Sequence, residues 1–214
     1  MEEKMKKLIC IAVLLFAASE LLCGCAAIEP EKRAYPLSFS VDYKNDAYEV
    51  IYAMANLAGS TGKEKQEGSQ KNEGKQPLAF SGSDFAQIRQ RYDESQEYYL
   101  DLGHVQAILF SRRLLRRPQE YEETLRYLQS EEILGQNARV FVCDEPGEVI
   151  AAAEGTGTSL GEFLSGMYEN RPEQEKPRAL ELGTLYQEYY NYNTIPSFPE
   201  LNVEEGRILL LDKV

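Results

Sequence analysis

The sequence predicts an α/β fold in the broad sense (α+β): a single domain in which helices pack on a mixed β-sheet, with a β-hairpin near its start. Three observations support this class. Two runs rich in β-branched and aromatic residues stand close together near the start. From residue 84 onward, apolar patterns with helical spacing alternate with short strand-like runs. About 190 residues remain after an N-terminal segment of 24, enough for one sizeable core.

The two early runs, residues 35–43 and 47–57, predict the hairpin. They are separated by Lys44-Asn45-Asp46, and Asn and Asp tolerate the positive φ that a tight turn requires. The next segment, residues 59–77, consists mainly of Gly, Ser, Lys, Glu, Gln and Asn. Such a segment cannot offset its ordering entropy by burial, so we expect a disordered, solvated loop at 59–77.

Helices and strands then alternate along the chain. Helices are expected at 84–96, from Pro118 towards Gly135, at 146–153 with an end near Gly155, after the capping box Ser159-x-x-Glu162, and around 182–189. Strands are expected at 105–110, 139–143 and 207–211, and a loop at 196–199. The side chains expected to face inward are Tyr121, Leu125, Leu128, Leu160, Phe163, Leu164 and Met167. Phe85, Ile88 and Tyr92 share one face of the first helix, and the last helix is marked by Leu182, Leu185, Tyr186 and Tyr189.

The N-terminus has the pattern of an export signal. A basic head is followed by an apolar stretch from residue 8 to 22, which ends in Leu22-Cys23-Gly24-Cys25. This ending resembles a bacterial lipobox, which implies cleavage before Cys25 and acylation of its thiol with diacylglycerol. Residues 1–24 are then a lipoprotein signal peptide and residues 25–34 a membrane tether. The alternative is a transmembrane anchor, but its uninterrupted apolar core, 8–18, is shorter than a spanning helix and Glu20 would lie in hydrocarbon.

Charge and cysteine usage exclude several classes. The formal net charge is -12, so nucleic acid is not an expected partner, because phosphate contacts need clustered cations. An acidic surface is also repelled by anionic headgroups, which leaves the lipid as the contact with the membrane. After processing at Cys25 only Cys143 would remain, so no internal disulfide can form. Cys143 lies in an apolar strand pattern, where a buried structural thiol is expected and not a nucleophile.

The sequence offers no catalytic constellation, and neither a metal nor a cofactor is expected. His104 is the sole histidine, which excludes a two-histidine metal site, and a local structural role is expected for it. The Gly-Thr-Gly-Thr-Ser segment at 155–159 does not follow a strand pattern, so an interhelix loop is favoured over a phosphate cradle. Four clustered tyrosines are compatible with a core and rim position, or with a surface for a protein partner. They are Tyr186, Tyr189, Tyr190 and Tyr192.

An ordered series of local patterns resembles the Ger(x)C family, the C-subunit lipoproteins of bacterial spore germinant receptors. The series consists of Glu31-Lys32-Arg33-Ala34-Tyr35, Phe39-Ser40-Val41-Asp42, Leu100-Asp101-Leu102-Gly103-His104-Val105, Ile108-Leu109-Phe110, Tyr127-Leu128, Asn137, the strand to Cys143 and Val149-Ile150. It covers roughly residues 22–155. Residues 205–213 are similar to the strand that closes the family's first domain, so 35–214 is expected to be a domain like the N-terminal domain of this family.

The resemblance implies a non-enzymatic subunit on the outer face of the inner spore membrane. It would be held there by the diacylglyceryl group on Cys25 and would act in spore germination by contacts with integral-membrane receptor subunits. The alternative is a small-molecule-binding lipoprotein of an importer or sensor. Such a protein needs a large ligand cleft, for which this length leaves little room. An enzyme is disfavoured because no nucleophile and base can be named.

Overall fold

The computed structural model describes residues 3, 5, 28–54 and 77–211. Two compact units are distinguished, Met1–Lys32 and Arg33–Val214. In the first unit the described residues include one 3-10 turn, η1 (Pro30–Lys32). Cys25, the predicted signal peptide except residues 3 and 5, and residues 59–76 of the predicted loop lie outside the described residues. Within the described residues, no helix has both the length and the apolar character needed to cross a bilayer.

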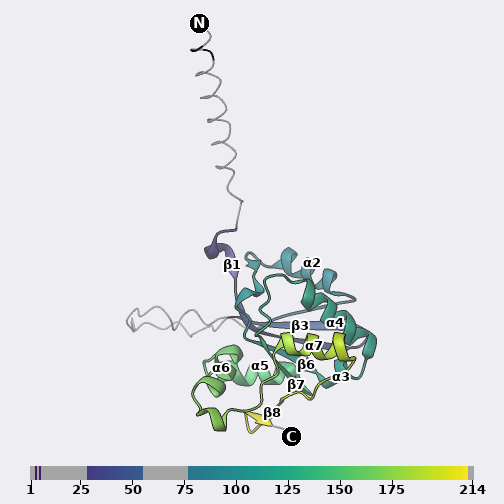
Figure 1. The fold of residues 1–214 in the computed structure, drawn as a ribbon, viewed down its shortest axis with the longest axis vertical. Helices are drawn as coiled ribbons and strands as arrows, with labels where there is room; N and C mark the ends of the chain where they lie inside the picture. Colours follow the sequence, from purple (N-terminus) through teal and green to yellow (C-terminus); the bar gives the residue numbers. More distant parts are fainter. Residues whose placement is uncertain (1–2, 4, 6–27, 55–76, 212–214) are drawn as a thin grey trace, which may run out of the picture. The chain divides into compact units, whose positions relative to one another are not determined.

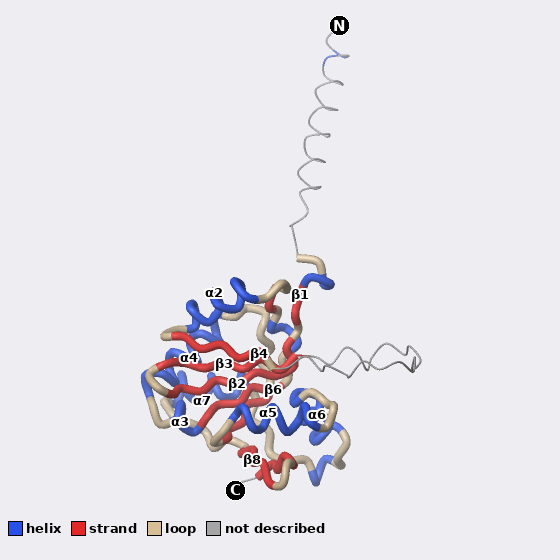
Figure 2. Tube along the Cα trace, turned by 180° about the vertical axis from the view of Figure 1, so that it is seen from behind, coloured by secondary structure: helices blue, strands red, loops and turns tan. Residues whose placement is uncertain are grey.

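The second unit is built on a seven-stranded mixed sheet with helices on both faces (Figures 1 and 2). Its strand order is β4-β3-β2-β6-β7-β8-β9. The central strands β2, β6, β7 and β8 are parallel, and antiparallel pairing adds β3 and β4 at one end and β9 at the other. The bounds are β2 (Pro36–Lys44), β3 (Ala47–Met54), β4 (Leu78–Gly82), β6 (Ala107–Ser111), β7 (Arg139–Cys143), β8 (Glu200–Glu204) and β9 (Arg207–Leu211). The predicted class, a single α/β domain with a mixed sheet, is confirmed.

The helices and minor elements connect these strands. The helices are α2 (Phe85–Ser95), α3 (Arg112–Leu115), α4 (Pro118–Ser130), α5 (Pro146–Gly155), α6 (Leu160–Glu169) and α7 (Leu182–Tyr192). The 3-10 turns are η3 (Leu102–His104) and η4 (Glu173–Glu175). Two short strands, β1 (Arg33–Ala34) and β5 (Tyr99–Leu100), form a separate parallel pair.

The predicted hairpin is the pair β2 and β3. Asn45 and Asp46 occupy its two-residue turn with φ of 52° and 56°, the left-handed conformation that their short polar side chains tolerate. The turn places Lys44 opposite Ala47, and the register continues with Val41 opposite Val50. The turn chemistry therefore determines which side chains of both strands share a face.

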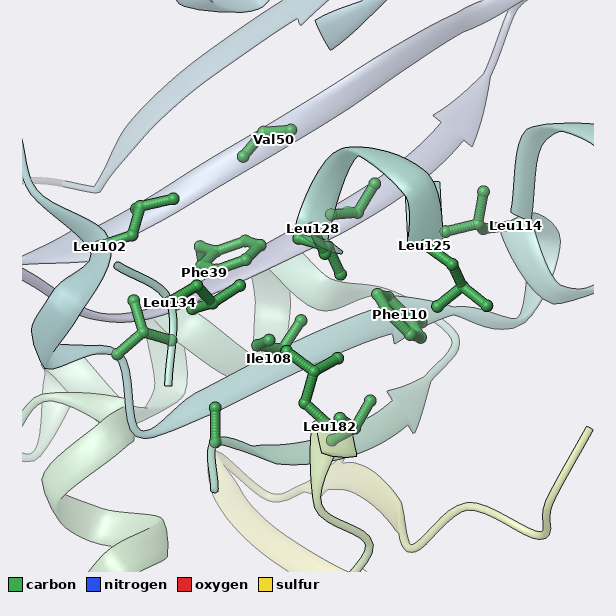
Figure 3. Close-up of a cluster of buried hydrophobic side chains, with 14 of the residues drawn as sticks. Phe39, Val50, Leu102, Ile108, Phe110, Leu114, Leu125, Leu128, Leu134 and Leu182 are labelled. Carbon is green, nitrogen blue, oxygen red and sulfur yellow. The ribbon is translucent and has the colours of Figure 1, made fainter. Parts of the chain in front are cut away.

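The two faces of the sheet carry separate cores. Phe39 of β2, Val50 of β3 and Phe110 of β6 point to one face, in one core with side chains of α2, α4 and α7. Figure 3 shows them with Leu125 and Leu128 of α4 and Leu182 of α7. On the other face, Leu109 and Phe141 pack against α5 and α6. Because successive side chains of a strand point to opposite faces, the apolar runs of β6 and β7 supply both cores, as expected of parallel strands covered on both sides.

The helix faces are largely as predicted, with two corrections. α4 ends at Ser130 and not near Gly135, because the chain leaves the helix at Glu131 (φ -81°, ψ 88°) and then buries Leu134 in the first core. In α6 the capping box is present, but Phe163 and Met167 are only partly buried. The α6 positions with full burial are Leu160, Gly161, Leu164 and Tyr168.

Two strands of the main sheet were not predicted. β4 pairs with β3 at one edge of the sheet, and β8 inserts between β7 and β9. β8 has the sequence Glu-Leu-Asn-Val-Glu, whose two apolar side chains both face the second core. This alternation is that of a half-buried strand, but over five residues it is a weak signal.

Candidate functional site

The four clustered tyrosines occupy two different environments on α7. Tyr186 and Tyr189 are partly buried against the first core, whereas 44% of Tyr190 and 61% of Tyr192 is exposed. Residues 186 and 189 are spaced by three and so share the inward face with Leu182 and Leu185. The exposed tyrosines are therefore Tyr190 and Tyr192 at the end of α7, with the exposed Ile195 just beyond the helix, and we call these three residues the tyrosine surface.

Ring contacts hold Tyr190 in place. Its ring centroid lies 5.2 Å from that of Tyr189 at 84°, and 6.3 Å from that of Tyr186. Tyr189 in turn meets the buried ring of Tyr121 on α4 edge-on, at 5.6 Å. Burial raises the pKa of Tyr189 and of Tyr190, so both phenols stay neutral at physiological pH. A neutral, braced aromatic ring is suited to a protein contact, because little side-chain entropy is left to lose on binding.

The chain reverses just after α7. Asn193 ends the helix in the left-handed conformation, with φ of 52°. Thr194 folds back and donates from its backbone N–H to the carbonyl oxygen of Glu188, at 3.2 Å, and from its hydroxyl to the Glu188 carboxylate, at 3.0 Å. These bonds position Ile195, half of which is exposed, within the tyrosine surface. A composition of tyrosine with one aliphatic side chain is typical of protein interfaces.

A second feature is a charged cluster at the carboxyl ends of the parallel strands. Arg113 donates to both carboxylate oxygens of Asp42, at 3.2 and 2.7 Å, and to Glu145 as well. Burial alone would raise the pKa of Asp42, but the bonds from Arg113 and Ser111 and the arginine's charge hold that pKa below its ordinary value. Its neighbour Arg112 pairs with Asp144 at 3.0 Å and with Glu200. These pairs connect the carboxyl ends of β2, β6 and β7 with the first residue of β8.

Asp101 and His104, considered in the sequence as metal ligands, both make local contacts within the fold. Asp101 accepts from the backbone N–H of Gly103 at 2.9 Å and from Arg33 at 2.7 Å. His104 is exposed, and its ring meets Tyr35 edge-on at 4.7 Å. Within the part of the chain that the structure describes, no group of three His, Cys, Asp or Glu side chains is arranged to hold a metal ion.

Two further predictions are confirmed. Cys143 is buried at the end of β7, and burial is the main cause that raises the pKa of its thiol to about 12. A thiol with this pKa carries almost no thiolate at neutral pH and is a poor nucleophile. Residues 156–159 form the turn between α5 and α6, where Gly157 has a φ of 79°. The glycine-rich segment is therefore an interhelix loop.

Sequence reasoning found the tyrosine surface only as a group of neighbours, and it missed the charged cluster. Asp42 and Arg113 are 71 residues apart, and no local pattern brings them together. The only available signal was an aspartate near the end of the predicted strand, directly after Val41.

The structure is a packed α/β domain, and its exposed tyrosines are of the kind found in contacts between proteins. A family model described as "Spore germination protein N-terminal domain" matches residues 27–203. This is most of the chain, and the chain belongs to that family. No curated protein and no solved structure gives a significant match. The chain is therefore a spore germination protein related to germinant receptors. Membership of this family implies, at a coarse level, association with receptor subunits and with the spore membrane.

Proposed function

We propose that this protein is the lipid-anchored C subunit of a spore germinant receptor, and that it acts by binding the receptor's integral-membrane subunits and not by catalysis. The observation that carries the proposal is the family match over residues 27–203, which begins two residues after Cys25. An acylated Cys25 would thus place the whole family domain directly beside the membrane, on its extracytoplasmic face.

The anchor follows from the chemistry of the first residue of the processed chain. A diacylglyceryl group on the Cys25 thiol contributes two acyl chains, and each buried methylene adds about 0.8 kcal/mol, so two chains hold firmly where one is marginal. The net charge of -12 belongs to a domain that anionic headgroups repel. Lipid and charge together favour a domain that is tethered to the outer face of the inner spore membrane without lying flat on it.

The contact with the receptor subunits is assigned to the tyrosine surface. Tyr190 and Tyr192 expose amphipathic rings, and Tyr190 is braced by Tyr186 and Tyr189. Buried tyrosines at the centre of an interface commonly account for much of the binding energy. Truncation of both exposed rings should therefore weaken the complex by about 2 kcal/mol or more, a loss of about thirtyfold in affinity.

The test is copurification from spore membranes with an epitope-tagged chain. The wild-type chain should bring down polytopic membrane subunits, and the variant Y190A/Y192A should lose most of them while keeping its abundance. Tyr98→Ala is the matched control, because 41% of Tyr98 is exposed and it lies on a different element. Cys25→Ala should leave a full-length, unacylated precursor. Recovery of the wild-type chain as a free monomer from spores that contain the receptor subunits would refute the proposed function.

A further inference from the structure

Arginine is concentrated in one short segment of this acidic protein. Four of the six residues from Arg112 to Arg117 are arginines, in a chain of formal net charge -12. The segment comprises α3 and the two residues before α4, directly after β6. In open α/β sheets the carboxyl ends of the strands are where ligands are commonly bound, so this segment has a position suited to recognition.

A depression of about 680 Å³ lies at this segment. Its walls come from the end of β2, the hairpin turn, α3 and the first turn of α4. The lining residues are Tyr43, Lys44, Asn45, Arg113, Arg116, Arg117, Pro118 and Glu120. Four of these eight side chains are cations and one is an anion, which is the reverse of the balance in the whole chain. We call this feature the basic depression.

The cations of the basic depression differ in how firmly they are engaged. Arg113 is held by Asp42 and Glu145 and forms a fixed part of the wall. Arg117 lies over the ring of Tyr43, 5.1 Å from its centroid, and its ion pair with Glu120 is long, at 3.5 Å. Arg116 is exposed and forms no ion pair within the described residues. Arg116 and Arg117 are therefore the guanidinium groups that can turn to an incoming anion.

The start of α4 reinforces this charge. Arg117 is the N-cap of the 13-residue helix, has no side-chain cap hydrogen bond and is followed by Pro118. The positive end of the helix dipole thus coincides with the arginine cluster at the same wall of the depression.

We propose that the basic depression binds a carboxylate-bearing segment of a protein partner, a refinement that rests on the proposed function as a receptor subunit. A small anion would stay in contact with water here, because Arg116, Arg117 and Pro118 are all exposed. A protein segment can cover these groups and continue along α4. Glu122 and Arg126 on the outer side of α4 lie within electrostatic range of Tyr190 on α7, so one partner can reach from the basic depression to the tyrosine surface. Arginine pairs with carboxylates in a bidentate geometry that favours such recognition.

The direct test measures binding of a fluorescein-labelled hexaglutamate peptide, with hexaglutamine as the control peptide, to the full chain in phosphatidylcholine nanodiscs. Any binding of hexaglutamate is informative, because the net charge of the protein repels it. R116E/R117E should weaken binding by about tenfold or more, and added salt should weaken it for the wild type. R171E/R178E changes the charge equally in an exposed loop after α6, and it should change binding by less than about twofold.

Four results would overturn the inference. The first is hexaglutamate binding no stronger than hexaglutamine binding, and the second is an equal loss of hexaglutamate affinity in both double variants. The third is displacement of hexaglutamate by inorganic phosphate at equal anion concentration, which would assign the depression to small anions. The fourth is binding of phosphatidylglycerol vesicles through Arg116 and Arg117 without binding of the peptide, which would assign the depression to lipid.

Copurification from spores separates this inference from the proposed function. If both hold, R116E/R117E loses the membrane subunits and R171E/R178E keeps them. If the wild type and R116E/R117E both keep the subunits, the proposed function stands and the basic depression is not part of the contact. If the wild type itself brings down no subunit, the proposed function fails, whatever the peptide does.

Discussion

Gly161 in the first turn of α6 lies where the helix crosses β2, and its replacement by alanine tests how tightly the second core is packed. An alanine methyl carbon at this position would lie 2.5 Å from the carbonyl oxygen of Leu37 and 2.9 Å from its Cβ. Carbon atoms in contact are normally about 3.5–4.0 Å apart, so the overlap is about an ångström. The obstacle is the backbone of a central strand, which cannot rotate away as a flexible side chain can.

The cost of Gly161→Ala follows from this geometry. Helix α6 must move off β2, which loosens the packing of the buried Leu160 and Leu164. Overpacking of this kind costs about 1–3 kcal/mol, while the helix gain from replacing glycine is at most about 1 kcal/mol and is small in a first turn. We expect a net destabilisation of about 2 kcal/mol, which lowers the Tm by roughly 4–8 °C in a domain of this size.

Gly166→Ala on the same helix is the matched control. Its methyl carbon would meet only the side-chain amide of Asn170, at 3.3 Å, and that amide can move. The helix gain should then dominate, and Gly166→Ala should be neutral or stabilising by up to about 1 kcal/mol. Urea unfolding followed by far-UV circular dichroism measures both variants. A Gly161→Ala protein as stable as the wild type, or equal losses in both variants, would refute the account of close packing.

Three further predictions concern buried polar groups. Asp42→Asn should lower the free energy of unfolding by about 1–3 kcal/mol at pH 7, because it removes a charged partner of Arg113. Since the pKa of Asp42 is lowered in the folded state, this stabilisation is complete above the unfolded-state pKa and is lost as the pH falls through the folded-state pKa. Urea unfolding curves of the two proteins should therefore converge below about pH 4. Cys143 should resist iodoacetamide in the native protein and react in urea, as read by peptide mapping; rapid native labelling would contradict its burial. Tyr48→Phe removes a hydroxyl that donates to Glu123 at 2.8 Å, and should cost about 1 kcal/mol in the same unfolding assay; an unchanged midpoint would show that the bond contributes nothing.

The sequence predicted those parts of the fold whose cause is local. The Asn45-Asp46 turn and the Ser159-x-x-Glu162 capping box each depend on residues within a few positions, and both are present. The end of α4 was predicted wrongly because the chain departs from the helix to bury Leu134, a tertiary effect with no local signal. β8 was missed because its place in the sheet depends on pairing with β7, far away in the sequence.

The candidate site was predictable only in part for the same reason. Proximity in sequence grouped four tyrosines, but helical geometry divides them into two that pack inward and two that are exposed. In the structure Tyr186 and Tyr189 share the inward face of α7 with Leu182 and Leu185, at the three- and four-residue spacings of a helix. The basic depression needs residues from β2 and α4, so its assembly could not be read from the chain. Acylation of Cys25 and disorder at 59–77 stay predictions.

Helix α4 is the element through which both proposed contact surfaces depend on the core. The hydroxyl of Tyr48 on β3 bonds to Glu123 of α4, and Phe110 of β6 meets Tyr121 edge-on at 5.9 Å. The helix is thus held to two strands by independent contacts, and it presents Tyr121 to Tyr189 as a fixed support. A preorganised surface loses little conformational entropy on binding. Substitutions on the buried side of α4 should therefore weaken both surfaces together, whereas exposed substitutions at either surface should act separately.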